Sequence, residues 1–257
     1  MKTIHLHGHP VAGGRCPLIC TPLVGSSRAE VLRELAVILL KQPDVIEWRM
    51  DYFRNIGNLP EVLAVARSIK EAAGTIPIIC VCRSENEGGE STPLDEGEVV
   101  RLYSALCECK LADIIDYELS KAPERRERLR KTSRDNGVAM ILSYHNFKET
   151  PDAAALLAKF SDAERYGADI AKVAVMPRNP EDVLTLMGST WRASESVGIP
   201  LIGMSMGALG AVSRMASGFF GSALTFAVGV SSSAPGQIPI EELRAVLETV
   251  RATGNVR

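Results

Sequence analysis

The chain has 257 residues, of which 46% are hydrophobic and 23% are charged, and its formal net charge is −2. This balance is typical of a globular protein, and it provides no basic field that would attract nucleic acid or an anionic membrane. Its apolar runs are far shorter than the roughly 20 residues of a membrane-spanning helix, and MKTIHLHGHP lacks the apolar core of a signal peptide. We therefore expect a cytoplasmic protein.

Short apolar runs alternate with longer amphipathic runs, which predicts strands that alternate with helices. The predicted strands, in chain order, are residues 18–24, 44–50, 77–82, 113–119, 138–144, 169–176, 200–206 and 222–228. The helices predicted to follow them are residues 26–42, 59–74, 96–110, 123–137, 152–167, 180–198, 209–216 and 240–254. Eight such pairs in a chain near ~250 residues predict an α/β fold, a closed (β/α)8 TIM barrel. The missing GxGxxG turn argues against the alternative, an open doubly wound sheet.

Residues 1–16 precede the repeated pattern. The stretch TIHLHGHPVAGG alternates in polarity and contains turn-forming glycines, so it predicts a hairpin that closes the bottom of the barrel. Because no linker or low-complexity segment interrupts the chain, we expect residues 1–257 to form one domain. The six cysteines are expected to be unpaired, since a bridge between near neighbours such as Cys80 and Cys82 would be strained.

Polar residues occur at the carboxyl ends of several predicted strands, which is where TIM barrels place their active sites. In chain order they are Glu47, Arg49, Arg83, Ser143, His145, Lys172, Ser205 and Met206, followed by Arg214 after the seventh strand and Ser233 and Gln237 after the eighth. To gather so many polar side chains at one end of a barrel costs free energy unless they bind something polar. The sequence therefore predicts a polar ligand site there.

Lys172 lies in the middle of the predicted strand DIAKVAVM, where a charged side chain is unusual. Strand alternation places it on the same face as Ile170 and Ala174. If that face is the barrel interior, burial and nearby arginines favour the neutral amine, which is the form that attacks a ketone to make a Schiff base. The alternative is a lysine that extends to the surface or pairs with Asp169 or Glu47.

His145 ends another predicted strand, and a histidine titrates near neutral pH, which suits proton transfer. Glu87, in the loop RSENEGGE, could accept a hydrogen bond from its imidazole and fix its tautomer, while the two glycines let the loop bend over the site. The alternatives are a structural histidine and an ordinary turn.

His5, His7 and His9 form an HxHxH pattern that could hold a metal at the start of a barrel. The only other histidine is His145, so too few ligands remain for a binuclear metal hydrolase, and we expect no metal site. No Walker, CxxC or HExxH motif occurs either.

Seven segments of the chain resemble type I 3-dehydroquinate dehydratase, an enzyme of the shikimate pathway. They are EWRMD, CRSENEGGE, SYHNF, DIAKVAVMP, GMSMGALGAVSR, FGSALTFAVG and SAPGQIP, and they occur in this order between positions 47 and 239. Each segment alone is weak, but seven in order over nearly the whole predicted barrel are highly specific.

The resemblance implies a syn elimination that turns 3-dehydroquinate into 3-dehydroshikimate through an imine on Lys172. His145 would move the protons and Glu87 would orient it. Substrate binding would fall to Arg214, which would hold the carboxylate, and to a further set made up of Ser233, Gln237, Glu47, Arg49, Arg83 and Met206. The resemblance also implies that no metal or organic cofactor is needed and that the protein is a homodimer.

Two other readings of the sequence remain open. A class I aldolase would also use a Schiff-base lysine, but it would not explain SYHNF together with SAPGQI. A barrel that binds a carboxylated ring without catalysis would have no use for a buried amine. Trapping of an imine on Lys172 would separate the non-catalytic barrel from the dehydratase.

Overall fold

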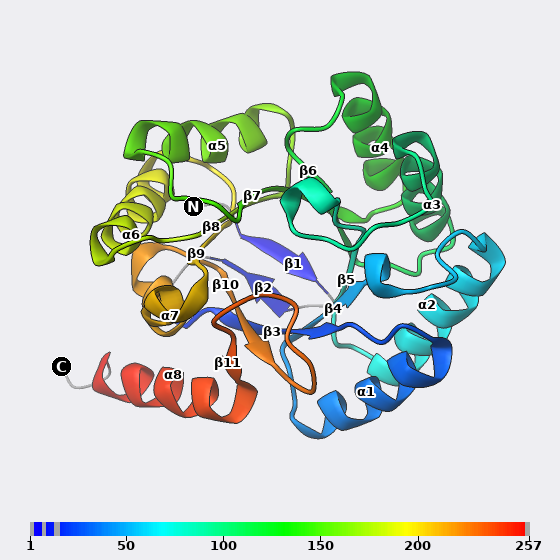
Figure 1. The fold of residues 1–257 in the computed structure, drawn as a ribbon, viewed down its shortest axis with the longest axis horizontal. Coiled ribbons are helices and arrows are strands. Elements are labelled where there is room, and N and C mark those ends of the chain that lie inside the picture. The colour runs from blue at the N-terminus through cyan, green and yellow to red at the C-terminus, as the bar shows by residue number, and fades with distance from the viewer. Residues whose placement is uncertain (1–2, 7–8, 13–15, 255–257) are drawn as a thin grey trace.

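Figure 1 shows a computed structural model, which describes residues 3–6, 9–12 and 16–254. A ring of helices surrounds a curled parallel sheet. The barrel strands are β3 (Leu18–Leu23), β4 (Val45–Arg49), β5 (Ile78–Val81), β6 (Ile114–Glu118), β7 (Ala139–Asn146), β8 (Ile170–Val175), β9 (Leu201–Ser205) and β10 (Leu224–Val228). The helices are α1 (Arg28–Leu40), α2 (Leu59–Ala73), α3 (Glu96–Glu108), α4 (Pro123–Asp135), α5 (Ala153–Arg165), α6 (Pro180–Ser196), α7 (Gly207–Ala216) and α8 (Ile240–Gly254). The alternation of strand and helix predicted from the sequence is confirmed.

The sheet closes on itself. Strands β3 to β9 follow one another in chain order, and β10 pairs in parallel with β3 at the other end. A parallel bridge between Leu201 of β9 and Ser222, just before β10, joins the two edges. A short strand, β11 (Ile238–Pro239), adds to the other side of β10. The predicted TIM barrel is therefore confirmed, with all carboxyl ends of its strands at one end.

Side-chain caps set where many of the helices begin. The capping residues that accept a hydrogen bond from the first turn are Ser27 of α1, Asn58 of α2, Asp95 of α3, Asp152 of α5 and Asn179 of α6. Each satisfies a backbone N–H that has no partner within its helix, which is worth roughly 1 kcal/mol. Three short 3₁₀ helices, η1 (Met50–Tyr52), η2 (Glu85–Glu87) and η3 (Ser217–Phe220), lie in the connections.

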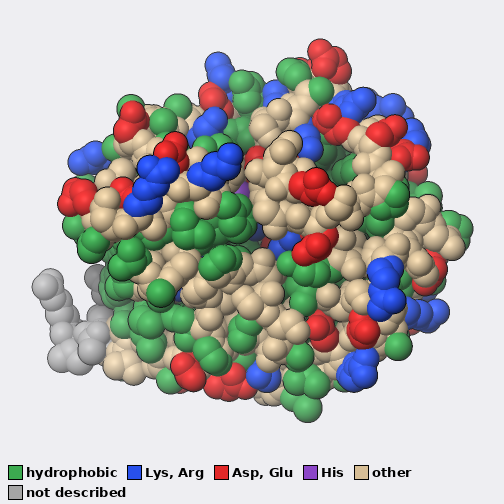
Figure 2. Space-filling model, in the orientation of Figure 1, with side chains coloured by type: hydrophobic (Ala, Val, Ile, Leu, Met, Phe, Trp, Pro, Cys, Tyr) green, Lys and Arg blue, Asp and Glu red, His purple; other side chains and the backbone are tan. Residues whose placement is uncertain are grey.

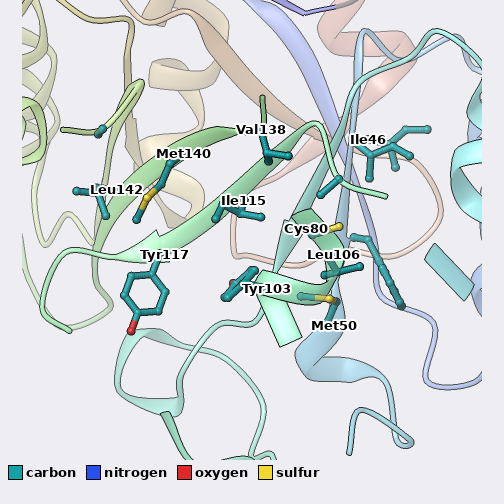
Figure 3. Packing of buried hydrophobic residues seen from close by; sticks show 14 of the residues in the cluster. Ile46, Met50, Cys80, Tyr103, Leu106, Ile115, Tyr117, Val138, Met140 and Leu142 are labelled. Atoms are coloured by element: carbon teal, nitrogen blue, oxygen red, sulfur yellow. The ribbon is translucent and has the colours of Figure 1, made fainter. Parts of the chain in front are cut away.

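Alternation along each strand divides the core into two layers. In β8, Ile170 and Ala174 belong to the cluster inside the barrel, whereas Val173 and Val175 pack against the helices. Figure 3 shows part of the outer layer, where Tyr103 from α3 lies near Tyr117 from β6. Their rings meet edge to face, with centroids 6.1 Å apart. Both faces of the sheet are therefore buried, which explains the apolar strands.

The N-terminal hairpin occupies the end of the barrel where the strands begin. β1 (Ile4–Leu6) pairs antiparallel with β2 (His9–Val11), and both cross the middle of the ring in Figure 1. Leu6 and Val11 join the interior cluster, so the hairpin closes the bottom of the barrel as predicted. Among the described residues, no helix is long and apolar enough to cross a membrane.

Candidate active site

Lys172 lies inside the barrel, with only 5% of its surface exposed. Its Nζ atom donates hydrogen bonds to Asp116 Oδ2 at 3.0 Å and to Glu47 Oε1 at 3.2 Å. The same nitrogen lies 4.5 Å from the ring centroid of Phe226, which is a favourable position for a cation. The lysine thus points inward, as strand alternation predicted, and it does not extend to the surface.

These contacts bear on the charge of Lys172. The sequence-based expectation of a neutral amine considered burial and nearby arginines, but two carboxylates lie within hydrogen-bonding distance of Nζ. The pairing with Glu47, which the sequence left open as an alternative, is therefore present, and the neutral amine remains a prediction.

Asp116, on β6, is a site residue that the sequence reasoning missed. Its side chain is fully buried and accepts hydrogen bonds from Arg83 at 2.9 Å and from Ser143 Oγ at 2.5 Å, besides that from Lys172. Burial alone would raise the pKa of Asp116, but Arg83 and Lys172 outweigh it and hold this pKa below its usual range. Asp116 is therefore a fixed negative charge beside the amine.

His145 and Glu87 form a buried hydrogen-bonded pair, which the sequence reasoning anticipated. The distance from His145 Nδ1 to Glu87 Oε2 is 2.9 Å, and the backbone N–H of His145 donates to the same oxygen, also at 2.9 Å. Because a carboxylate oxygen accepts, the pairing favours the tautomer with the proton on Nδ1. The lone pair of Nε2 is then available as a base.

Burial changes the pKa of both members of this pair. Desolvation raises the pKa of Glu87 to about 7, against the opposing effect of Arg83. Desolvation, together with the positive charges of Arg83 and Lys172, lowers the pKa of His145 well below 6.5. At neutral pH the imidazole is therefore uncharged, as a general base must be.

Two buried carboxylates fix the loop that carries Glu87. Asp51 accepts hydrogen bonds from the backbone N–H groups of Arg83 and Glu90, at 3.3 and 3.1 Å. Glu118 accepts from both the backbone N–H and the hydroxyl of Ser84, each at 2.7 Å. Both ends of the loop are thus attached to neighbouring elements, η1 and β6, and the position of Glu87 is fixed.

Gly88 allows this loop to lie against the rest of the site. Its φ is +80°, which favours glycine, and a Cβ atom there would come within 2.2 Å of the Phe147 ring. The glycine is therefore needed for close packing, beyond the bending that the sequence suggested.

Arg214, on α7, is a buried guanidinium that has no carboxylate partner among the described residues. It is 1% exposed. Its guanidinium donates to the Pro235 carbonyl at 3.0 Å, to the Phe226 carbonyl at 3.4 Å and to Met204 Sδ at 3.7 Å. Its Nε atom has no partner in the described structure. Burial lowers its pKa to about 10. An uncompensated buried cation is costly, which points to an anionic ligand.

The remaining predicted residues surround one small cavity of about 40 Å³. Nine of the ten residues with a predicted catalytic or substrate-binding role line it, whereas Ser143 and Ser205 do not. The tenth, Arg214, lies directly behind Met204 and Phe226, which belong to the cavity wall. Arg49 forms a two-pronged ion pair with Asp51 and donates to the Ser233 carbonyl at 3.3 Å. Gln237 bonds to the backbone and the hydroxyl of Ser233. The loop after β10 therefore covers the cavity.

Of the HxHxH segment, His5 is exposed on β1, whereas His7 and the side chain of His9 lie outside the described part of the chain. Within the described ranges, no group of three or more histidine, cysteine or acidic side chains is arranged to hold a metal ion.

Comparisons with known proteins agree with this geometry. A family model described as type I 3-dehydroquinase matches residues 19–253. A 3-dehydroquinate dehydratase from Albidiferax ferrireducens is 52% identical over 97% of this chain and 95% of the relative, and one from Geobacillus sp. strain WCH70 is 49% identical over 97% and 96%.

Solved structures show the same similarity. The crystal structure of 3-dehydroquinate dehydratase from Geobacillus kaustophilus HTA426 superposes with a TM-score of 0.96 at 48% identity, over 100% of this chain and 98% of that one. A type I 3-dehydroquinate dehydratase from Clostridium difficile, with covalently modified comenic acid, gives 0.92 at 32% identity and 98% coverage of both chains.

Proposed function

The chain belongs to the type I 3-dehydroquinase family, and from this premise we propose that Lys172, His145 and Glu87 carry out its reaction. The activity is that of a 3-dehydroquinate dehydratase, a hydro-lyase of the shikimate pathway, and the type I family acts through a Schiff base. The geometry supports a role for each of the three residues.

Lys172 condenses with the ketone carbon of 3-dehydroquinate. Starting from the ammonium, the C–N bond forms, the ketone oxygen leaves as water, and a protonated imine remains, with no net gain or loss of protons. The positive imine nitrogen withdraws electrons and makes the adjacent C2 hydrogen acidic. The barrel interior, closed below by the hairpin, keeps bulk water away from this intermediate.

His145 moves the proton in two stages. Its Nε2 atom removes the C2 proton, which converts the imine into an enamine and the imidazole into an imidazolium that Glu87 stabilises. The imidazolium then gives this proton to the C1 hydroxyl, which leaves as water on the same face, so the elimination is syn. Water finally hydrolyses the imine, and 3-dehydroshikimate and Lys172 are released.

Arg214 provides the positive charge that holds the substrate carboxylate. A guanidinium suits a carboxylate because two parallel hydrogen bonds can form. The cavity of about 40 Å³ is too small for a six-membered ring with its substituents, and Pro235 accepts from Arg214. The loop that carries Ser233 and Gln237 therefore opens to admit the substrate and then contacts its carboxylate.

The ring hydroxyls of the substrate face Glu47, Arg49 and Arg83, with Met206 as an apolar wall. Glu47 is the best placed acceptor, since its carboxylate bonds to Lys172 and lines the cavity. Arg49 donates to both oxygens of Asp51, and Arg83 donates to Asp116 and Ser143, so both arginines shape the pocket as much as they bind ligand.

The observation that carries this proposal is the buried lysine beside a hydrogen-bonded His–Glu pair in one cavity. We expect purified protein to convert 3-dehydroquinate into 3-dehydroshikimate, and Lys172→Met to lose this activity while keeping its fold by circular dichroism. If Lys172→Met turned over at the wild-type rate, the lysine would have no part in the chemistry.

The assembly we propose is a homodimer formed through the face around α7. Residues 196–240 contain one charged side chain, Arg214, and it is buried. The large exposed hydrophobic residues on α6, α7 and η3 are Leu184, Trp191, Leu209, Val212 and Phe219, each 48% to 62% exposed. Figure 2 shows hydrophobic side chains gathered in this region. The part of this face formed by α7 and η3 carries no exposed charge, so it can meet its own copy without repulsion, as a two-fold interface requires.

Light scattering after size-exclusion chromatography would test the dimer. Leu209→Glu should give monomers, because it puts a charge into the interface, whereas Leu40→Glu on α1 should stay dimeric, although Leu40 is 84% exposed. A monomeric wild type would contradict the proposal.

We also propose that residues 1–257 act as one domain in the cytoplasm, where the six free cysteines would stay reduced.

A further inference from the structure

Asp116 lies against the nitrogen on which the reaction is proposed to take place. We propose that Asp116 is the counter-ion of the protonated imine on Lys172, and that it keeps the imine nitrogen protonated while Glu47 turns to the substrate. This inference rests on the proposed function, because it presupposes an imine on Lys172.

The number of N–H groups on the reacting nitrogen forces a choice between two carboxylates. The ammonium of Lys172 has three N–H groups, and it donates to Asp116 at 3.0 Å and Glu47 at 3.2 Å. A protonated imine nitrogen is bonded to two carbons and keeps a single N–H group. Only one of the two carboxylates can therefore stay hydrogen-bonded after the imine has formed.

Asp116 is the carboxylate that cannot leave. Its Oδ1 accepts from Ser143 and its Oδ2 from Arg83, and Arg83 also donates to Ser143 Oγ at 2.6 Å, which closes a ring of three buried side chains. By contrast, the Glu47 carboxylate makes a single hydrogen bond among the described residues, and Lys172 is its donor. Glu47 also lines the cavity, where it can turn to a substrate hydroxyl.

Other charges surround the imine nitrogen, and their balance makes one fixed anion important. The titratable and charged groups that face it are Cys20 from β3, Glu47 and Arg49 from β4, Arg83 from β5, Glu87 from η2, Asp116 from β6 and His145 from β7. His145 is uncharged at neutral pH, and Arg49 pairs with Asp51. Without Asp116, Arg83 would lose its nearest carboxylate, and its positive charge would face the positive charge of the imine.

The experiment measures how the protonated imine depends on pH. Cyanoborohydride reduces the protonated form, so the fraction of chain that carries a reduced adduct, read by intact mass at saturating 3-dehydroquinate, follows imine protonation. In Asp116→Asn the pH of half-maximal trapping should fall by about one to three pH units, which is the usual effect of removing an opposite charge at this distance. That corresponds to about 10- to 1,000-fold less protonated imine at high pH.

Two matched variants separate Asp116 from a general loss of buried charge. Glu118→Gln removes a carboxylate two residues further along β6, 3.8 Å from Arg83, and Glu47→Gln removes the other partner of Lys172. Glu118→Gln should trap with the wild-type pH profile. Glu47→Gln, which also loses a substrate contact, should need more 3-dehydroquinate for saturation but keep the wild-type pH of half-maximal trapping. An unchanged profile in Asp116→Asn, or an equal shift in Glu118→Gln, would overturn the proposal.

Glu47→Gln also decides the question if Asp116→Asn fails to fold. A downward shift in Glu47→Gln would make Glu47 the counter-ion and overturn the proposal, whereas the wild-type profile would support it. The absence of any wild-type adduct on Lys172 would be a different result, since it would contradict the proposed imine itself.

Discussion

The substitution Glu87→Gln should stabilise the folded state relative to wild type, and this gain in the free energy of unfolding should be larger at alkaline than at acidic pH. Burial raises the pKa of Glu87 from 4.5 to about 7, so the folded state loses stability as pH rises through this window. At about 1.36 kcal/mol for each pH unit, the ionised carboxylate costs about 3 kcal/mol at pH 8 and about 1 kcal/mol at pH 5. A glutamine carries no such cost.

Urea denaturation of both proteins at pH 5 and pH 8, followed by tryptophan fluorescence, would measure this difference. The stability of Glu87→Gln relative to wild type should increase by about 2 to 3 kcal/mol from pH 5 to pH 8. Glu195→Gln, at an exposed position on α6, should show little change between the two. If the relative stability of Glu87→Gln were the same at both pH values, burial would not be raising the pKa of Glu87, and our reasoning about the His145–Glu87 pair would fail.

Three further predictions concern the activity. Wild-type kcat should rise through about pH 7 as Glu87 ionises. Glu87→Gln should lack this rise and be about 10- to 150-fold slower at pH 8, which is the equivalent of one charge-assisted hydrogen bond. A rise that the variant retained would implicate another group. His145→Ala should still form the imine by mass but dehydrate about 100- to 10,000-fold more slowly, and near-normal turnover would show that another base acts. Arg214→Met should raise KM by at least about tenfold while raising the melting temperature, because an unpaired buried cation is lost; a lower melting temperature would show that Arg214 stabilises the fold.

The barrel could be predicted from the sequence because its periodicity is local. Most strand residues are apolar on both faces, and several helices begin at a side-chain cap, such as Ser27 and Asn58, so neighbouring residues suffice to place them. A charge inside such a strand is conspicuous, and for this reason the sequence indicates Lys172 as a site residue. Asp116, inside the predicted strand DIIDYEL, is a charge of the same kind, and the sequence analysis did not include it.

Apart from the His145–Glu87 pair and the possible pairing of Lys172 with Glu47, the partners within the site could not be predicted, because they depend on contacts across the barrel. Asp116 meets Lys172 from a strand two places away, and its distance is set by the register of the strands between them. Arg214 lies on a helix, where sequence spacing alone does not show which side chains turn toward the barrel. The neutral amine was expected because the nearby arginines were visible in the sequence, while the closeness of two carboxylates was not.

The most direct test of the central claim is the identity of the residue that borohydride labels. Wild-type protein reduced in the presence of 3-dehydroquinate, digested and analysed by mass spectrometry should carry the reduced adduct on the peptide that contains Lys172, with activity lost in proportion to labelling. Recovery of an unmodified Lys172 peptide after full inactivation, or an adduct on another lysine, would contradict the imine mechanism.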